Sequence, residues 1–174
     1  MEEHQTIGGL ILNCENDMSA LEQLYLLYKN KVFAYAYTIL RDFSLAEDAL
    51  HETFIRLHKS AHRFKGKSEP QTFILGITKN TARELYRKQK RFVIQSMDAL
   101  DKSVNSNDFT QNILMRQLLE ALPVKQRETI VLHIYAELTF VEISSLLHAP
   151  VSTIKSRYQK ALENLRNYMG ENNL

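Results

Sequence analysis

One stretch near the C-terminus, residues 119–166, constrains the fold of the chain more than any other. Thr139 can cap a helix there, because Glu142 follows at the third helical position and completes the reciprocal capping pattern. Apolar residues then repeat at helical spacing up to Pro150, which cannot continue a helix. A second amphipathic helix follows directly. The sequence therefore predicts two helices joined by a tight turn.

The second of these helices carries polar and basic side chains at its N-terminal end. Either Ser152 or Thr153 can cap it, and Ile154 begins its apolar face. The side chains expected to meet a ligand are Ser152, Thr153, Lys155, Ser156, Arg157, Gln159 and Lys160. Lysine and glutamine donate to purine edges, whereas arginine, lysine and hydroxyl groups hold phosphates. This layout predicts a reader of the DNA major groove, and the alternative is an ordinary helical hairpin with a solvated basic face.

The N-terminal half is predicted to form three helices. Apolar residues repeat at helical spacing over 21–40 and indicate one long amphipathic helix. Ser44 with Glu47 reads as a second capping box, so the next helix is expected at 45–59. A third helix is expected at 71–91. Proline and glycine are scarce among the 174 residues, at 3 and 5, and no convincing strand pattern is present, so an all-α class follows.

The charge of the chain is segregated rather than large. The formal net charge is only +2, but basic residues gather at 79–91 and 155–166, and acidic ones near 1–22 and 42–52. Such segregation suits a protein with one face for DNA and another for protein. In the third helix the basic residues Lys79, Arg83, Arg87, Lys88, Lys90 and Arg91 are opposed only by Glu84, and they predict a track for phosphates.

The loop before this third helix has one aromatic residue, Phe64, among Arg63, Lys65 and Lys67. A basic loop with an aromatic ring suits an unpaired base, because every base offers a π face and the backbone offers charge. The alternative is that Phe64 is a small satellite of the core.

Both halves of the chain resemble the extracytoplasmic-function sigma factors of bacterial RNA polymerase. The motifs that carry the resemblance are Leu122-Pro123, Arg127, Glu142-Ile143, Leu147, Thr153-Ile154-Lys155-Ser156-Arg157, Ala161 and Leu165-Arg166 in the C-terminal half, and Ala46-Glu47-Asp48, His51-Glu52-Thr53-Phe54, Thr72-Phe73-Ile74-Leu75, Ile77 and Asn80 in the N-terminal half. His51, Phe73 and Glu84 replace the glutamine, tryptophan and aspartate usual there. Two glycines usual in the family are absent, where Glu137 and His148 stand.

The resemblance implies two small helical domains joined by a flexible linker. It suggests a sigma-2-like domain at 19–92, a linker at 93–110 and a sigma-4-like helix-turn-helix domain at 111–170. Residues 1–18 precede the resemblance, and a flexible N-terminal arm is expected there. The implied partners are core RNA polymerase, through its β′ clamp helices and β flap, promoter DNA and an anti-sigma factor. The implied function is an alternative sigma factor that directs promoter-specific transcription initiation.

The resemblance also implies three sets of contact residues. Polymerase binding is expected at Asp48, His51, Glu52 and Arg56. Minus-ten DNA binding is expected at Phe64, Lys65, Lys67, Asn80, Arg83, Arg87, Lys88 and Arg91. Minus-thirty-five DNA binding is expected at the seven residues of the second C-terminal helix given above. Any single residue of the polymerase set could instead belong to a solvated helix face without a partner protein. Asn80 could instead form a hydrogen bond to a neighbouring loop.

Other chemistry is not supported by the sequence. His58 and His62 share a helical face, but no third metal ligand accompanies them, and His133 reads as a bonded core histidine. The single Cys14 excludes an intramolecular disulfide and fits a reducing cytoplasm. An acidic N-terminus argues against a signal peptide, and the apolar run at 8–12 is too short to insert in a membrane. No enzyme activity, metal or cofactor is therefore expected.

Two rival functions remain open. The first is a stand-alone regulator that binds an operator without polymerase, and the second is an interaction module that has kept the fold and lost promoter use. A dimeric regulator needs a dimerisation element and two half-sites about one helical turn apart. Nothing in the sequence resembles such an element, and residues 20–92 would have no role in it.

Overall fold

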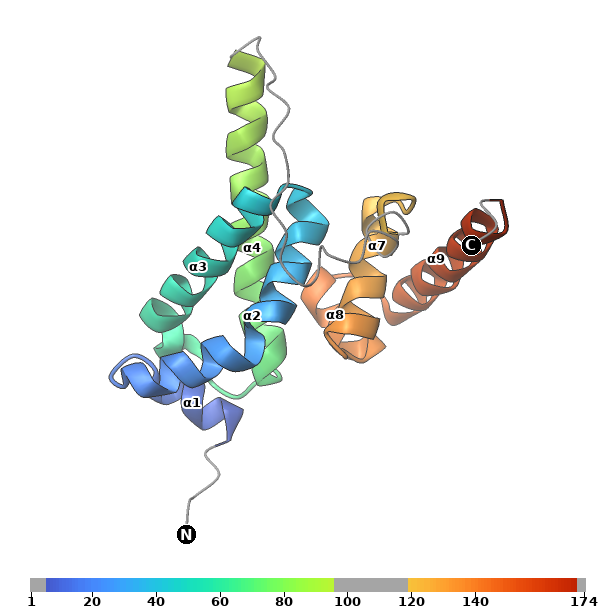
Figure 1. Cartoon of the computed structure of the whole chain (residues 1–174). Coiled ribbons are helices and arrows are strands. Elements are labelled where there is room, and N and C mark those ends of the chain that lie inside the picture. The colour runs from blue at the N-terminus through green and yellow to red at the C-terminus, as the bar shows by residue number, and fades with distance from the viewer. Residues whose placement is uncertain (1–5, 96–118, 172–174) are drawn as a thin grey trace. The chain divides into compact units, whose positions relative to one another are not determined.

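The computed structural model describes residues 6–95 and 119–171, which belong to two compact units (Figure 1). All regular structure in these two ranges is helical, which confirms the all-α class. The expected linker at 93–110 and the expected start of the second domain at 111 fall mostly outside the described residues. Residues 93–95 are the exception, because they end the last helix of the first unit.

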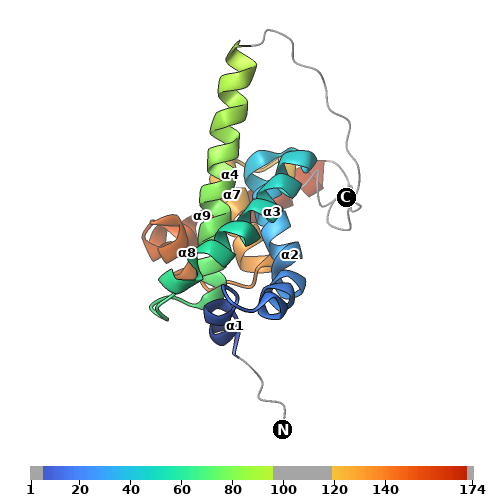
Figure 2. The same cartoon turned by 90° about the vertical axis from the view of Figure 1, so that its left-hand side faces the viewer.

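Three helices build the first unit: α2 (Met18–Leu40), α3 (Phe43–Ser60) and α4 (Pro70–Gln95). Each packs against the other two, and their shared core contains the fully buried side chains of Val32, Tyr35, Leu57, Ile74 and Leu75. Pro70 occupies the first position of α4, where its missing N–H costs nothing. Figures 1 and 2 both show the C-terminal turns of α4 extending past α2 and α3, so that these turns lie open on this unit.

The turn between α2 and α3 differs from the prediction. Arg41 adopts a left-handed conformation at φ 54° and ends α2, and the side chain of Asp42 then accepts a hydrogen bond from the Leu45 backbone N–H at 2.9 Å. The expected capping box at Ser44 and Glu47 is therefore wrong. Aspartate caps a helix as well as serine does, and the tight turn at Arg41 starts the helix earlier.

The N-terminal segment also differs from the prediction. A short helix, α1 (Ile7–Asn13), begins at Thr6, whose hydroxyl accepts a hydrogen bond from the Gly9 N–H at 3.2 Å. It packs on α2 and buries Leu10 and Ile11, and Cys14 just beyond its end is buried as well. The expectation of a flexible arm is therefore wrong for this segment, because tertiary burial stabilises a helix too short to form alone.

Two histidines hold the end of α1 in place. His58 Nδ1 lies 2.8 Å from the Cys14 carbonyl oxygen, and His62 Nδ1 lies 3.6 Å from a carboxylate oxygen of Glu15. His62 belongs to the short 3-10 helix η1 (Ala61–Arg63) that follows α3. His58 and His62, which have the spacing of paired metal ligands, thus connect α3 and η1 to the residues at the end of α1. Within the described residues, no three potential metal ligands lie together.

The second unit contains α7 (Val124–Ile130), a π-helical turn η2 (Val131–Tyr135), α8 (Phe140–Leu147) and α9 (Val151–Glu171). Arg127 stabilises the first turn of this unit. Its buried guanidinium donates from Nε to the Leu119 carbonyl at 2.7 Å and from Nη2 to the Leu122 carbonyl at 2.9 Å. The Leu119 carbonyl also accepts from the Leu122 N–H at 3.2 Å, so Arg127 adds a second donor there and a side-chain donor at Leu122. The arginine of the Leu-Pro motif is therefore a structural residue.

The helical pair of α8 and α9 follows the prediction at the start of α8. The Thr139 N–H donates to the Glu142 carboxylate at 2.7 Å, and the Glu142 N–H donates to the Thr139 hydroxyl at 3.3 Å, so the capping box is confirmed. The expected cap of the next helix is wrong, because α9 begins at Val151 and places Ser152 and Thr153 inside its first turn.

Two residues of this unit stand in the left-handed region. They are Glu137 at φ 62° and His148 at φ 52°, the positions where the resembling family has glycine. The backbone geometry of both turns is thus retained, at the cost of placing a Cβ where glycine has none.

His133 lies between two aromatic rings. Its ring centroid is 4.3 Å from that of Phe140 and 4.9 Å from that of Tyr158, and its Nδ1 lies 2.7 Å from the Leu138 carbonyl oxygen. The prediction of a bonded histidine in the core of the helical pair is confirmed. Its role is to connect η2 to both helices of the pair.

Candidate nucleic-acid interface

The exposed face of α4 is rich in basic side chains. Ile74, Thr78 and Ala82 are buried against the core, whereas the opposite face carries exposed polar and basic side chains. These exposed residues are Asn80, Arg83, Arg87, Lys88, Lys90 and Arg91. Lys79 is buried and does not belong to this face, so the basic run expected to begin there is interrupted. A helix face of this kind presents successive cations to a phosphate backbone.

Glu84 is the one acidic side chain within this basic face. Its carboxylate oxygens lie 2.9 Å from Lys88 Nζ and 2.9 Å from an Arg56 guanidinium nitrogen of α3. Hydrogen bonds from Lys88 and then Arg56 lower the pKa of Glu84 to about 2. The carboxylate is therefore charged across the whole physiological range, and it attaches α4 to α3.

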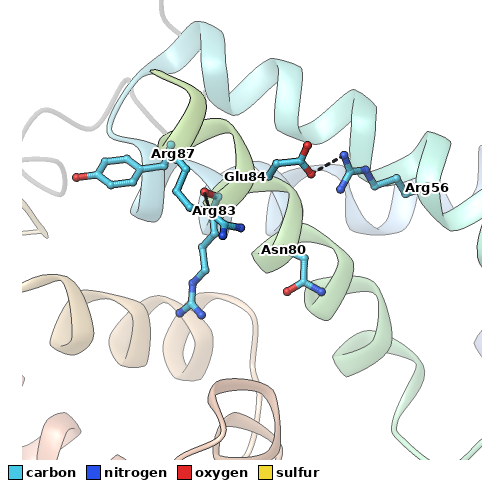
Figure 3. A pocket seen from close by; sticks show the side chains of 6 residues that line it. Arg56, Asn80, Arg83, Glu84 and Arg87 are labelled. Carbon is cyan, nitrogen blue, oxygen red and sulfur yellow. Dashed lines mark hydrogen bonds and ion pairs between the residues drawn. The ribbon is translucent and has the colours of Figure 1, made fainter. Parts of the chain in front are cut away.

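Arg56 is held on its other side as well. Its Nε lies 2.6 Å from the Glu52 carboxylate one turn earlier, and that hydrogen bond is the main reason why the pKa of Arg56 is raised. The sequence predicted a polymerase contact for Arg56 and Glu52. In the structure both are half-buried partners in an ion-pair network that reaches Glu84 (Figure 3).

A surface pocket of about 570 Å³ lies beside this network. Its lining residues are Arg56, Asn80, Arg83, Glu84, Tyr86 and Arg87. Figure 3 shows Asn80, Arg83, Glu84 and Arg87 along successive turns of α4, with Arg56 reaching Glu84 from α3. Tyr86 was missed by the sequence analysis. The available signal was an aromatic residue between two arginines of the basic helix, three positions after Arg83 and one before Arg87.

Phe64 is not on this surface. It is 6% exposed, its ring centroid lies 5.2 Å from that of Phe73, and a Cβ added at Gly8 of α1 would come within 3.3 Å of its ring. The expected loop platform for an unpaired base is therefore wrong, and the alternative of a core residue is what the structure has. Burial of an aromatic ring is favourable, and α1 provides the cover that the sequence analysis did not foresee.

The rest of this loop is exposed. Lys65 and Lys67 flank Gly66, which has a positive φ of 66° that other residues rarely adopt. The loop thus offers two cations before the start of α4.

The exposed face of α3 combines acidic and apolar side chains. Asp48 and His51 are both exposed and lie one turn apart. Ile55, one turn further, is 46% exposed and was not assigned to any site by the sequence analysis. An exposed apolar residue beside charged ones is a common feature of protein-binding surfaces.

In the second unit, α9 presents most of its expected contact residues to solvent. Ser152, Lys155, Ser156, Gln159 and Lys160 are exposed, and Thr153 and Arg157 are half-buried. Ile154 and Ala161 are buried on the opposite side. Leu162, one residue after Ala161, is 39% exposed. The N-terminal turns of α9 thus carry hydroxyl, amide and amino groups behind a scaffold helix, as in a helix-turn-helix reader.

The two units match two regions of one protein family. The family models that match are Sigma-70 region 2, over residues 24–92, and Sigma-70, region 4, over residues 113–165. The chain therefore belongs to the sigma-70 family of RNA polymerase sigma factors.

Curated relatives point to the extracytoplasmic-function group of this family. The ECF RNA polymerase sigma factor SigW of Bacillus subtilis is 28% identical, and the match covers 87% of this chain and 90% of SigW. SigX of the same organism is 26% identical over 84% of this chain and 81% of the relative. SigK of Mycobacterium tuberculosis is 28% identical over 87% of both chains. Sigma factors give RNA polymerase its promoter specificity in initiation and are not enzymes themselves.

Solved structures share the fold. CnrH in complex with the cytosolic domain of CnrY gives a TM-score of 0.72 at 17% identity, over 94% of this chain and 97% of CnrH. The sigma factor RpoE of Bartonella quintana, in complex with the anti-sigma factor NepR, gives 0.73 at 22% identity, over 86% of this chain and 96% of RpoE. In the part of the chain that the structure describes, no helix has the length and apolar character needed to cross a membrane.

Proposed function

We propose that this sigma factor uses three separate surfaces in initiation. The exposed face of α3 binds core RNA polymerase, the basic face of α4 with the loop at 65–67 binds the minus-ten region, and the N-terminal turns of α9 read the minus-thirty-five element. The observation that carries the proposal is the contrast between α3 and α4 within one compact unit. One helix exposes Asp48, His51 and Ile55, and the other exposes a run of cations.

On α3, the proposed contact with polymerase is made by Asp48, His51 and Ile55, with the β′ clamp helices as the partner surface. A mixed charged and apolar patch fits a protein partner better than a phosphate backbone. Arg56 and Glu52 take a different part in this proposal. They fix the orientation of α3 relative to α4 through Glu84, so that polymerase and DNA surfaces keep a constant spacing.

On α4, Asn80, Arg83, Arg87, Lys88 and Arg91 are proposed to bind the minus-ten DNA, together with Lys65 and Lys67 of the loop. Phe64 is omitted because it is buried. The arginines and lysines hold the phosphate backbone, and Asn80 reaches an unpaired base. Capture of an unpaired base offsets the cost of unstacking it, about a few kcal/mol.

On α9, Lys155 and Gln159 are proposed to contact base edges in the major groove. Ser152, Thr153, Ser156, Arg157 and Lys160 are proposed to hold phosphates and fix the register of the helix. The second unit is further proposed to meet the β flap of polymerase, a surface that the family resemblance implies.

An anti-sigma factor is proposed as the regulator of this chain. The support is that the similar RpoE structure is a complex with an anti-sigma factor. Because the proposed partner of the active state is RNA polymerase, the proposed compartment is the bacterial cytoplasm.

The deciding experiment is transcription in vitro with sigma-free core polymerase, the purified chain and a library of upstream DNA. Transcripts whose start sites share two upstream boxes are expected, and they would define the promoter. Asp48→Lys should abolish these transcripts, because it reverses a charge at the proposed polymerase surface. Glu22→Lys, an exposed reversal on α2, is the matched control and should leave them intact. Full transcription by Asp48→Lys would refute the assignment of α3.

A second pair of variants tests α9. Lys155→Glu should weaken binding of the polymerase complex to the upstream box, because it places a carboxylate in the groove. Lys125→Glu carries the same reversal at an exposed position of α7 and should have little effect. An unchanged footprint with Lys155→Glu would reject α9 as the reader. Failure of the unmodified chain to bind core polymerase would favour the operator-binding regulator instead.

A further inference from the structure

Three aromatic rings of the second unit form a closed cluster, with one ring from each of η2, α8 and α9. His133 of η2 stacks on Phe140 of α8, at 4.3 Å between the ring centroids and 23° between the ring planes. Tyr158 of α9 stands nearly perpendicular to His133, at 4.9 Å and 85°, and lies 5.3 Å from Phe140 at 62°. Stacked and edge-to-face rings at these distances attract one another through the charge distribution of their π systems. The stacked pair of His133 and Phe140 therefore sets the position of the Tyr158 ring.

His133 is also held to the turn that precedes α8. Its Nδ1 lies 2.7 Å from the Leu138 carbonyl oxygen, and because a carbonyl oxygen only accepts, Nδ1 carries the proton of this hydrogen bond. The Leu138 N–H in turn donates to the carbonyl of Leu132, the residue before His133, at 3.0 Å. The imidazole thus keeps one orientation relative to this turn, a constraint that an aliphatic side chain would not have.

Tyr158 connects the three-ring cluster to the side chains proposed to read bases. Lys155 precedes it by three residues and Gln159 follows it directly, and both are exposed, whereas Tyr158 is half-buried. Because all three belong to one helix, a rotation of α9 that displaces Tyr158 also displaces Lys155 and Gln159. Hydrogen bonds to base edges require a defined geometry, whereas phosphate contacts hold the protein on DNA without reading its sequence. A displaced α9 would therefore lose discrimination between bases before it lost its hold on the DNA backbone.

We propose that His133 is a positioning residue for base readout, which acts through Tyr158 to set the rotation of α9 in the major groove. The imidazole itself touches no base in this proposal. Its contribution is to discrimination between sequences rather than to affinity for DNA in general. This inference rests on the proposed function of α9 and adds to it the residue that fixes the placement of the reading side chains.

The test uses the complete complex of core polymerase and this chain with two promoter fragments that differ only in the minus-thirty-five box. One fragment carries the box found by transcription in vitro, and the other carries unrelated bases at the same positions. His133→Leu removes the ring and the hydrogen-bond donor but keeps an apolar side chain. It should lower the ratio of the affinities for the two fragments by about tenfold, the effect of one lost base contact, and leave the affinity for the altered fragment within about twofold.

A second variant deletes the ring in another way. His133→Asn can still donate to the Leu138 carbonyl, so it removes only the ring and should lower the same ratio about as much. It replaces the leucine variant in the assay if that variant does not fold. Backbone NMR signals of α8 and α9 establish which variants are folded under the conditions of the assay.

Three further variants separate positioning from a loss of stability. His133→Phe keeps a ring against Tyr158 and should hold the ratio to within about threefold of that of the unmodified chain. Val131→Ala truncates a buried side chain of η2 outside the three rings, and it should leave the ratio unchanged although it destabilises the unit. Tyr158→Leu should lower the ratio as His133→Leu does. The variant with both changes should lose no more than either single variant, because both break the same connection.

Four results would overturn the inference. The first is an unchanged ratio with a folded His133→Leu or His133→Asn variant, and the second is an equal loss of affinity for both fragments. The third is an equal fall of the ratio with Val131→Ala, which would assign the effect to instability. The fourth is a double variant whose losses multiply, which would separate His133 from Tyr158.

The proposed function of α9 is tested separately by the unmodified chain. If the unmodified chain distinguishes the two fragments, any of the four results overturns the inference and leaves the function of α9 standing. An unmodified chain that binds both fragments equally would overturn the function of α9 and the inference together.

Discussion

Replacement of His148 by glycine should stabilise the second unit. His148 ends α8 in the left-handed region, at φ 52° and ψ 48°, and its N–H donates to the Ser144 carbonyl. For a residue with a Cβ this conformation costs roughly 1–2 kcal/mol, because the Cβ approaches the carbonyl oxygen that follows. Glycine pays no such penalty, and the hydrogen bond to Ser144 is made by the backbone and survives the substitution.

The expected gain is smaller than this full penalty. Glycine also gives the unfolded chain more freedom, which takes back about 0.4–1 kcal/mol. The mid-range values, about 1.5 minus about 0.7 kcal/mol, leave an expected net stabilisation of about 0.8 kcal/mol. His148→Ala is the matched control, since it removes the imidazole but keeps the Cβ and thus the backbone penalty. The free energy of unfolding of the glycine variant should exceed that of the alanine variant by about 1 kcal/mol.

Urea denaturation of the full chain, followed by backbone NMR signals of α8 and α9, measures this difference for the second unit. A glycine variant no more stable than the alanine variant would refute the argument, because backbone strain would then have no energetic consequence at this turn. Glu137, at φ 62°, gives an independent repetition of the same comparison.

Three other predictions follow from single contacts. Arg127→Met keeps the apolar stem but removes both guanidinium bonds, and the Leu119 carbonyl then keeps only the Leu122 N–H, so the change should cost about 1.5–3 kcal/mol of unfolding free energy. A loss below about 1 kcal/mol in urea denaturation would contradict this role of Arg127. The ion pairs of Glu84 lower its pKa to about 2, below the ordinary value of 4.5. The stabilisation from these ion pairs is therefore complete above pH 4.5 and disappears as the pH falls toward 2. A carboxyl NMR titration of Glu84 with a midpoint above 4 would disprove this. Gly8→Leu should crowd the ring of Phe64 at an overpacking cost of about 1–3 kcal/mol, and it should therefore raise amide exchange in α1 by on the order of tenfold. Gly170→Leu is the control and should not raise amide exchange, because nothing lies within 4 Å of its added Cβ. Unchanged exchange with Gly8→Leu would argue against the close packing of α1.

Much of the helical framework could be predicted because its signals are local. The capping box of Thr139 and Glu142 uses groups three residues apart, and Pro150 limits the backbone through its own ring. Hydrophobic periodicity located α2 and α4 to within a few residues. The same reasoning failed at Ser44, because Asp42 offered an equally good local cap and the sequence alone does not say which of two caps is used.

The basic face of α4 and the polar start of α9 were also determined by the sequence. Charged side chains spaced opposite an apolar stripe point away from it, so the exposure of Arg87 or Lys155 follows from the pattern, whereas the burial of Lys79 does not. What these faces contact was expected from motifs rather than from spacing, and both family matches support that expectation.

Only the tertiary structure decided which aromatic ring is accessible and which charges are already paired. Phe64 is buried because α1, distant in sequence, brings Gly8 against it, whereas Tyr86 is 45% exposed. Arg56 is an internal brace because folding places Glu84 of another helix within 2.9 Å. The physical reason is the same in each case: burial and ion pairing depend on neighbours that meet only when the chain has folded, whereas caps and periodicity are set within one or two turns of the chain.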